Sequence, residues 1–101
     1  MTRQNKFGAA FRRVRLARGL TQEDFAHQSG RTYVSELERG IKQPTLQKID
    51  DLVEALHVHP LTPLVLAYVN DYDMHSCDVL LTQVRKELDE VIISNTQVTG
   101  I

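Results

Sequence analysis

Residues 19–40 read GLTQEDFAHQSGRTYVSELERG, and the order of polar, apolar and glycine positions in this stretch decides the fold. Thr21 is a good helix N-cap because its hydroxyl can accept a hydrogen bond from the free amides of the next turn. We therefore predict a short helix over residues 22–28, which the serine and glycine that follow it interrupt. A further helix is predicted over residues 31–39, where the last glycine of the stretch ends it. The stretch is thus two short helices joined by a tight turn.

Apolar residues recur at helical spacing on both sides of this stretch. Upstream, a helix is predicted over about residues 6–18. Downstream, we predict a helix that Thr45 caps and that runs to about residue 56, another from residue 61 or 62 to residue 70, and a long one over about residues 74–93. The tail, residues 94–101, is predicted to be a short strand or frayed coil. In the helix capped by Thr45, the predicted buried side chains are Leu46, Ile49, Leu52, Val53 and Leu56.

The positive charge of this small protein is concentrated in its first half. A chain of 101 residues with 42% hydrophobic residues is enough for one modest core. Residues 1–48 carry ten Lys and Arg against four Asp and Glu, a net charge of +6, whereas residues 49–101 carry two against nine, a net charge of −7. This asymmetry favours contact between the first half and a polyanion such as nucleic acid.

The sequence also indicates the compartment. No stretch approaches the roughly 20 apolar residues that a membrane span needs, and no apolar run follows the N-terminus as in a secretory signal. Cys77 is the only cysteine, so an intramolecular disulfide is impossible. We therefore expect a cytoplasmic protein.

The helix predicted over residues 31–39 has one polar face. Val34 and Leu37 are its apolar positions and are expected to point inward, as are Phe25 and Ala26 of the preceding helix. A helix placed after a tight turn in this way can lie in the major groove of DNA. There its polar side chains form hydrogen bonds with base edges or phosphates. The side chains on the outward face are Arg31, Thr32, Ser35, Glu36 and Arg39.

Three short motifs are specific in combination, namely GLTQ at residues 19–22, LERG at residues 37–40 and PTL at residues 44–46. In this order and spacing they resemble the Cro/phage-repressor (XRE) family of helix-turn-helix regulators, over roughly residues 6–68. The resemblance implies an all-α, five-helix, lambda-repressor-like fold. It also implies a sequence-specific regulator of transcription that binds operator DNA, acts as a homodimer and is expected to repress.

The same resemblance assigns roles to individual residues. Gln22, at the start of a helix, is similar to a glutamine that contacts phosphate and braces the DNA-reading helix. Arg15 and Glu38 resemble a partly buried ion pair that ties the first helix to the DNA-reading helix, and a buried charge that lost its counter-ion there would be costly. The implied DNA-binding set is Gln22 on phosphate, Arg31, Thr32 and Glu36 on bases, Tyr33 and Ser35 from the same helix, and Arg39 and Lys42 on phosphates.

The sequence departs from the family pattern at one place. The spacing from Gly30 to Gly40 is two residues shorter than usual. This predicts either a shortened turn after Ala26 or an early end of the preceding helix near residue 28. The N-cap of the DNA-reading helix is then Gly30 or Ser29.

The chain is expected to divide into a DNA-binding domain at residues 1–70 and a C-terminal helix and tail at residues 71–101. The long helix carries an apolar stripe too wide for solvent exposure, which predicts a homodimer interface, because regulators of this kind read two half-sites about 34 Å apart. The tail is a candidate for an added strand across that dimer. The alternative is that the helix folds back on its own domain. The predicted dimerisation residues are Leu80, Leu81, Val84, Leu88, Val91 and Ile92.

Other chemistries have little support in the sequence. The histidines at residues 57, 59 and 75 and Cys77 form only weak pairs, without a C-x-x-C or H-E-x-x-H motif, so no metal is expected. No phosphate-binding glycine loop or nucleophile motif appears, so neither a cofactor nor an enzyme is expected. Two alternatives remain: the antitoxin of a toxin–antitoxin pair, which binds DNA and also a toxin, and a protein-interaction module on the same fold.

Overall fold

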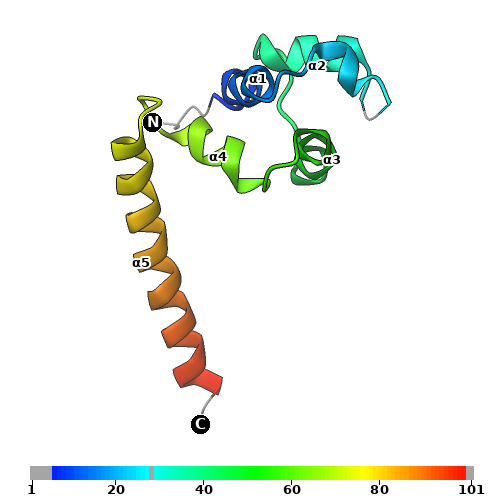
Figure 1. Ribbon diagram of the computed structural model, residues 1–101. Helices are drawn as coiled ribbons and strands as arrows, with labels where there is room; N and C mark the ends of the chain where they lie inside the picture. Colours follow the sequence, from blue (N-terminus) through cyan, green and yellow to red (C-terminus); the bar gives the residue numbers. More distant parts are fainter. Residues whose placement is uncertain (1–5, 28, 100–101) are drawn as a thin grey trace. The chain divides into compact units, whose positions relative to one another are not determined.

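The computed structural model describes residues 6–27 and 29–99, and every regular element in them is helical (Figure 1). This confirms the all-α fold class. The chain forms two compact units, Met1–Tyr68 and Val69–Ile101. The elements are α1 (Phe7–Ala17), the 3-10 helix η1 (Gln22–Phe25), α2 (Arg31–Glu38), α3 (Leu46–Leu56), α4 (Leu61–Tyr68) and α5 (Met74–Thr99).

The first unit has a single hydrophobic core. α1 packs against α2 and α4, and η1 packs against α2 and α3. Phe11 and Phe25 meet edge to face, with ring centroids 5.2 Å apart, and Phe7 lies 6.2 Å from Phe11. Edge-to-face aromatic pairs add to the free energy gained by burying apolar area. The buried apolar side chains are Phe7, Ala10, Phe11, Val14, Phe25, Val34, Leu37, Ile49, Leu52, Val53, Leu56 and Ala67.

α1 and α2 lie unusually close together at Gly8. A Cβ atom placed on Gly8 would overlap the backbone carbonyl of Leu37 in α2. Only glycine therefore allows this approach of the two helices. The position of α2 thus depends on a residue of α1 that carries no side chain.

The first of the two short helices within residues 19–40 ends earlier than predicted. η1 is a 3-10 helix that ends at Phe25, whereas the sequence predicted a helix to residue 28. The backbone amides of Ser29 and Gly30 both donate to the carbonyl of Phe25, and this closes the turn early. Ala26, predicted to face inward, is exposed as a result. Of the two candidate N-caps for α2, the structure has Gly30.

The prediction for α3 is right at its N-cap and wrong at its first residue. The hydroxyl of Thr45 accepts a hydrogen bond from the backbone amide of Lys48 at 3.1 Å, as a capping threonine does. Leu46, however, is 75% exposed. Leu46 lies in the first turn of α3, outside the core, whereas the other predicted side chains of α3 are buried in it.

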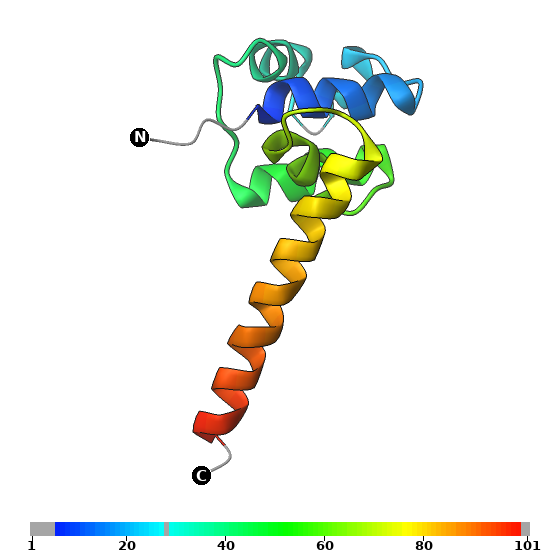
Figure 2. The ribbon, with the colours of Figure 1, turned by 90° about the vertical axis from the view of Figure 1, so that its left-hand side faces the viewer.

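The second unit contains one long helix, α5 (Figure 2). Its start is capped by Asp73, whose carboxylate accepts a hydrogen bond from the backbone amide of Ser76 at 2.7 Å. That hydrogen bond lowers the pKa of Asp73. The helix continues to Thr99, so the strand or coil predicted from residue 94 is wrong up to that residue. Residues 100–101 lie outside the described part.

Candidate nucleic-acid interface

The candidate interface is the outward face of α2. Val34 and Leu37 are completely buried and fix the opposite face of this helix to the core. Of the predicted DNA-binding residues on α2, Arg31 and Thr32 are exposed, whereas Ser35 and Glu36 are partly exposed. The outward face is therefore polar, reachable from solvent and held in a fixed orientation.

The first turn of α2 begins with a backbone conformation that favours glycine. Gly30 has φ +83° and ψ 149°, a region that L side chains rarely adopt. Arg31 Nε lies 3.3 Å from Glu23 Oε1, with both side chains about two-thirds exposed (67% and 66%). An exposed ion pair of this kind contributes only roughly 0–1 kcal/mol. Arg31 can therefore leave Glu23 for a phosphate or a base at little cost.

The end of α2 presents two cations next to a glycine turn. The backbone amide of Gly40 donates to the carbonyl of Leu37, and that of Ile41 donates to the carbonyl of Glu36, so the last turn is closed in a Schellman motif. Arg39, in the cap position, and Lys42, in the following loop, are both exposed. These two predicted phosphate contacts thus lie at the same end of α2.

Tyr33, the one aromatic residue of the predicted DNA-binding set, is only partly accessible. Its ring is partly buried against the core, and this desolvation raises the pKa of its hydroxyl. Lys48 Nζ, in α3, lies 4.8 Å from the ring centroid, within the range of a cation–π interaction. This contact of Lys48 is not predictable from the sequence, because no periodicity connects side chains on two different helices.

Behind this face, the Glu38 carboxylate binds residues from two other elements. It accepts two hydrogen bonds from the Arg15 guanidinium, at 2.7 and 2.8 Å, and one from the Gln22 side-chain amide at 3.1 Å. The side chains of Arg15 and Glu38 are only 8% and 3% exposed. Arg15 also donates to the carbonyl of Leu20 at 2.9 Å, and its hydrogen bonds with Glu38 raise its pKa. The cluster thus joins α1, the start of η1 and the end of α2.

A second arginine of α1 approaches the same carboxylate. Arg12 Nε lies 4.0 Å from Glu38 Oε1, and 60% of the Arg12 side chain is exposed. Arg12 is not among the residues predicted from the sequence, although its spacing of three from Arg15 places both on one helix face. Arg12 therefore adds positive charge near Glu38, which also binds Gln22 at the start of η1.

No metal-ligand cluster and no membrane-spanning helix is found among the described residues. Among those residues, no group of three or more His, Cys, Asp or Glu side chains is placed to hold a metal ion. His59 Nδ1 instead accepts a hydrogen bond from the backbone amide of Leu61 at 3.0 Å. None of the described helices has the length and apolar character to cross a membrane.

Residues 11–62, which include η1, α2 and the Glu38 cluster, match the helix-turn-helix family. The chain belongs to this family. Membership confirms the resemblance noted in the sequence and places the chain among DNA-binding transcriptional regulators, a class that is not enzymatic. The family match ends before α5 begins.

Named relatives of this helix-turn-helix chain support the same class. It is 43% identical over 61 residues to an uncharacterized HTH-type transcriptional regulator of Sinorhizobium fredii, covering 55% of this chain and 79% of that protein. It is 37% identical over 57 residues to the control protein C.BamHI of Bacillus amyloliquefaciens, covering 54% of this chain and 70% of that protein. The crystal structure of the restriction-modification controller protein C.AhdI from Aeromonas hydrophila is similar with a TM-score of 0.53 and 42% identity, covering 57% of this chain and 87% of that one.

Proposed function

We propose that this protein binds operator DNA in the cytoplasm as a homodimer and represses transcription from the gene beside that operator. The observation that supports this most is the polar outward face of α2, which is held rigidly by Val34 and Leu37 on the core side. A helix fixed in this way keeps its side chains in register with base edges in the major groove.

Thr32 and Glu36 are the proposed base contacts, with Arg31 beside them at the start of the helix. They are spaced four residues apart, so they lie on one helix face. A hydroxyl can bind several base edges, whereas a carboxylate accepts from the amino group of cytosine. Glu36 therefore favours a cytosine in the half-site.

The proposed phosphate contacts surround this face. Arg39 and Lys42 lie at the end of α2. Gln22 lies at the start of η1, where its amide already bonds to Glu38. A phosphate bound there would contact the Gln22 side-chain amide, whose position is set by its hydrogen bond to Glu38 of the buried ion pair. Such contacts position the protein on the duplex without reading its sequence.

One relative is named as a control protein, C.BamHI, and the similar solved structure is that of the restriction-modification controller protein C.AhdI. We take this as support for a role in controlling a restriction-modification locus, ahead of a role as an antitoxin. Genes for an endonuclease and a methyltransferase beside this gene are the expected finding. A small toxin gene in their place would favour the antitoxin.

The homodimer is proposed to form through the apolar stripe of α5. Of its six predicted residues, Leu81, Val84, Leu88, Val91 and Ile92 are exposed large apolar side chains. A dimer carries two copies of α2, as recognition of two half-sites about 34 Å apart requires.

The test is a selection of bound genomic DNA fragments by the purified full-length protein. A pseudo-palindrome with half-sites about one helical turn apart is the expected product. Thr32→Ala and Glu36→Ala should then each cost about 1–3 kcal/mol on the operator and relax base choice at one position. Arg39→Ala should weaken operator and random DNA equally and make the salt slope shallower by about one.

Thr62→Ala is the matched control, because Thr62 is an exposed threonine in α4, outside the proposed DNA-binding set. It should leave both affinities unchanged. Equal losses on operator and random DNA for Thr32→Ala and Glu36→Ala would contradict the proposed base contacts. No enriched sequence at all would contradict operator binding.

A further inference from the structure

The apolar stripe of α5 has a regular register. One line of positions within this stripe, here called the seam, begins at Cys77 and continues at alternating spacings of four and three residues. This is the heptad repeat of a coiled coil, in which such positions of one helix insert between side chains of another. Along the helix the seam residues are Cys77, Leu81, Val84, Leu88, Val91 and Asn95.

Among residues 69–99, the described part of the second unit, α5 is accompanied by no second element that could cover this seam. Leu88 and Val91, in the middle of the seam, are 55% and 56% exposed. Isolated helices are marginal in water, and most helical stability in proteins comes from packing an apolar face. A helix of 26 residues is about 39 Å long, which is enough for three heptads of such packing. The seam therefore requires a partner from outside its unit.

We propose that this partner is α5 of a second copy, and that the two helices form a parallel, in-register, two-stranded coiled coil. The proposal rests on the homodimer proposed above and adds its register and direction. It assigns the seam to Leu81, Val84, Leu88 and Val91, with Cys77 and Asn95 at its two ends.

The charges beside the seam favour the parallel direction. Arg85 and Glu87 flank it on opposite sides, at the e and g positions of the repeat. In a parallel pair, the g position of one helix meets the e position of the other. Leu80 then lies beside the partner's Arg85, and Glu87 beside the partner's Ile92. Between Cys77 and Asn95 no like charges then meet, and Asp73 lies beside the partner's Asp78 only at the start of the helix, before the seam.

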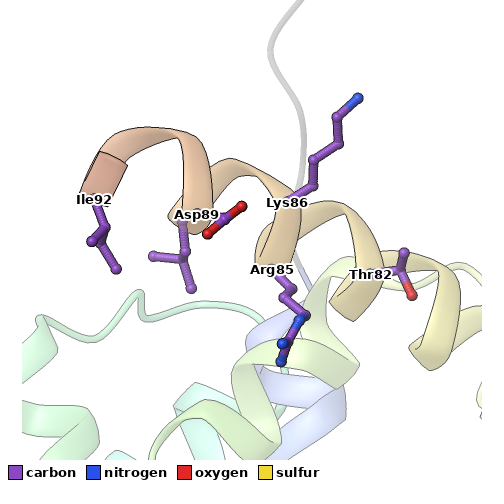
Figure 3. A pocket seen from close by; sticks show the side chains of 6 residues that line it. Thr82, Arg85, Lys86, Asp89 and Ile92 are labelled. Atoms are coloured by element: carbon purple, nitrogen blue, oxygen red, sulfur yellow. The ribbon is translucent and has the colours of Figure 1, made fainter. Parts of the chain in front are cut away.

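An antiparallel pair with the same overlap places each flank against itself. Arg85 would lie beside the partner's Arg85, and Glu87 beside the partner's Glu87. Like charges so placed are destabilising. Figure 3 shows Arg85 and Ile92, which share one flank, pointing to the same side of α5 while Lys86 points away. A hollow on α5 is lined by residues of this helix alone and includes both flank residues, Arg85 and Ile92, together with Thr82, Lys86, Leu88 and Asp89.

Asn95 supports the same arrangement. It occupies an a position, where a single asparagine specifies register and the number of strands at a cost in stability. In the parallel pair, its amide faces the partner's Asn95, and the two can form a hydrogen bond. In the antiparallel pair it faces the partner's Cys77, a weak hydrogen-bonding group. Leucine at a and valine at d favour more than two strands, and Asn95 counteracts that preference.

The single cysteine allows a test on the unmodified full-length protein. A disulfide requires the two Cα atoms within about 7 Å of each other. In the parallel pair, Cys77 faces the partner's Cys77. In the antiparallel pair, the two cysteines are separated by 18 positions, about 27 Å along the helix. Mild oxidation of dilute protein should therefore produce a disulfide-linked dimer that Cys77→Ser abolishes.

Two further variants separate the alternatives. The double variant Cys77→Ser/Asn95→Cys should also form the linked dimer if the helices are parallel. If they are antiparallel, both proteins with a single cysteine stay unlinked, and only Asn95→Cys with Cys77 retained becomes linked. If α5 folds back on its own chain, none of the three becomes linked. Either of these two results overturns the proposal.

The solution mass provides an independent measurement. Leu88→Lys should raise the dissociation constant of the dimer at least about 100-fold, because it places an unpaired charge in the seam. Val79→Lys is the matched control, because Val79 is 57% exposed on the same helix but lies off the seam. It should change that constant less than about threefold. Asn95→Leu should shift the mass above two chains.

These outcomes are distinguishable from failure of the proposed DNA binding. If Leu88→Lys and Val79→Lys have the same dimer constant while an operator is still enriched, the coiled coil is wrong and operator binding stands. If no operator is enriched but Cys77 still forms the linked dimer, the coiled coil stands and operator binding is wrong.

Discussion

Two leucines show how differently the two units of this chain hold their apolar side chains. Leu52 in α3 is completely buried within the first unit, whereas Leu88 in α5 is 55% exposed in the second. Both occupy apolar positions of amphipathic helices, so the sequence treats them alike. The first unit covers its apolar side chains with its own helices, whereas the described part of the second has a single helix, whose cover we propose comes from another chain. Under that proposal, folding and assembly depend on separate segments.

The largest effect is expected at Glu38. Glu38→Ala should lower the free energy of unfolding of the first unit by about 3–5 kcal/mol, because it leaves the Arg15 guanidinium buried without its counter-ion. Urea unfolding followed by circular dichroism measures this loss. Glu38→Gln keeps the shape and an acceptor and should lose less. A loss below about 1 kcal/mol for Glu38→Ala would show that the pair is not a structural element of the first unit.

The same truncation in the two units sharpens the comparison. Leu52→Ala should cost about 2–5 kcal/mol at every protein concentration, because it leaves a cavity in the core. Leu88→Ala should reduce the melting temperature only at concentrations where the dimer forms. Melting curves over a hundredfold range of concentration measure both. Leu46→Ala, at the exposed start of α3, is the control and should stay within about 0.5 kcal/mol. Concentration-independent loss for Leu88→Ala would place its cover within its own chain.

A smaller loss is expected where α1 meets α2. Gly8→Ala should lower the free energy of unfolding by about 1–3 kcal/mol, because the added methyl group overlaps the carbonyl of Leu37 and must push the two helices apart. Operator affinity should fall as well, since α2 is displaced. Ala9→Ser, at the exposed neighbouring position, serves as the control for both measurements. Unchanged stability and affinity would show that α2 does not depend on this close approach.

The smallest effect is a pH dependence at the start of α5. Because the folded state lowers the pKa of Asp73, its contribution is present above the unfolded pKa of about 4 and is lost as the pH falls through the lower folded value. The first turn of α5 should fray in that range, as amide exchange at Ser76 measures. Asp73→Asn keeps an N-cap acceptor that does not titrate. Fraying that is the same in this variant would assign the effect to another group.

Most helices were predictable because their start and stop signals are local. Thr45 caps α3 with its own hydroxyl, and glycines follow the ends of α1 and α2. The family was predictable for a similar reason, since its motifs are short and contiguous. The residues proposed to read bases follow from the same stretch, and their roles stay predictions.

Other features could not be predicted because they depend on contacts between segments. The early end of η1 depends on how the chain closes onto the Phe25 carbonyl. The cation–π contact of Lys48 with Tyr33 joins two helices whose packing no periodicity describes. Residues 94–99 are helical despite their Thr and Val residues, because a long helix propagates more easily than it starts.

The sequence by itself determined the all-helical fold, the family and the heptad spacing of α5, since each depends on near neighbours along the chain. Only the tertiary structure decided that Glu38 joins three elements, that Gly8 sets the approach of α1 to α2, and that Leu46 is exposed while Leu52 is buried. The physical reason is that burial and buried charge are properties of packed surfaces. A local pattern states which side chains share a helix face, but it does not state which other helix covers them.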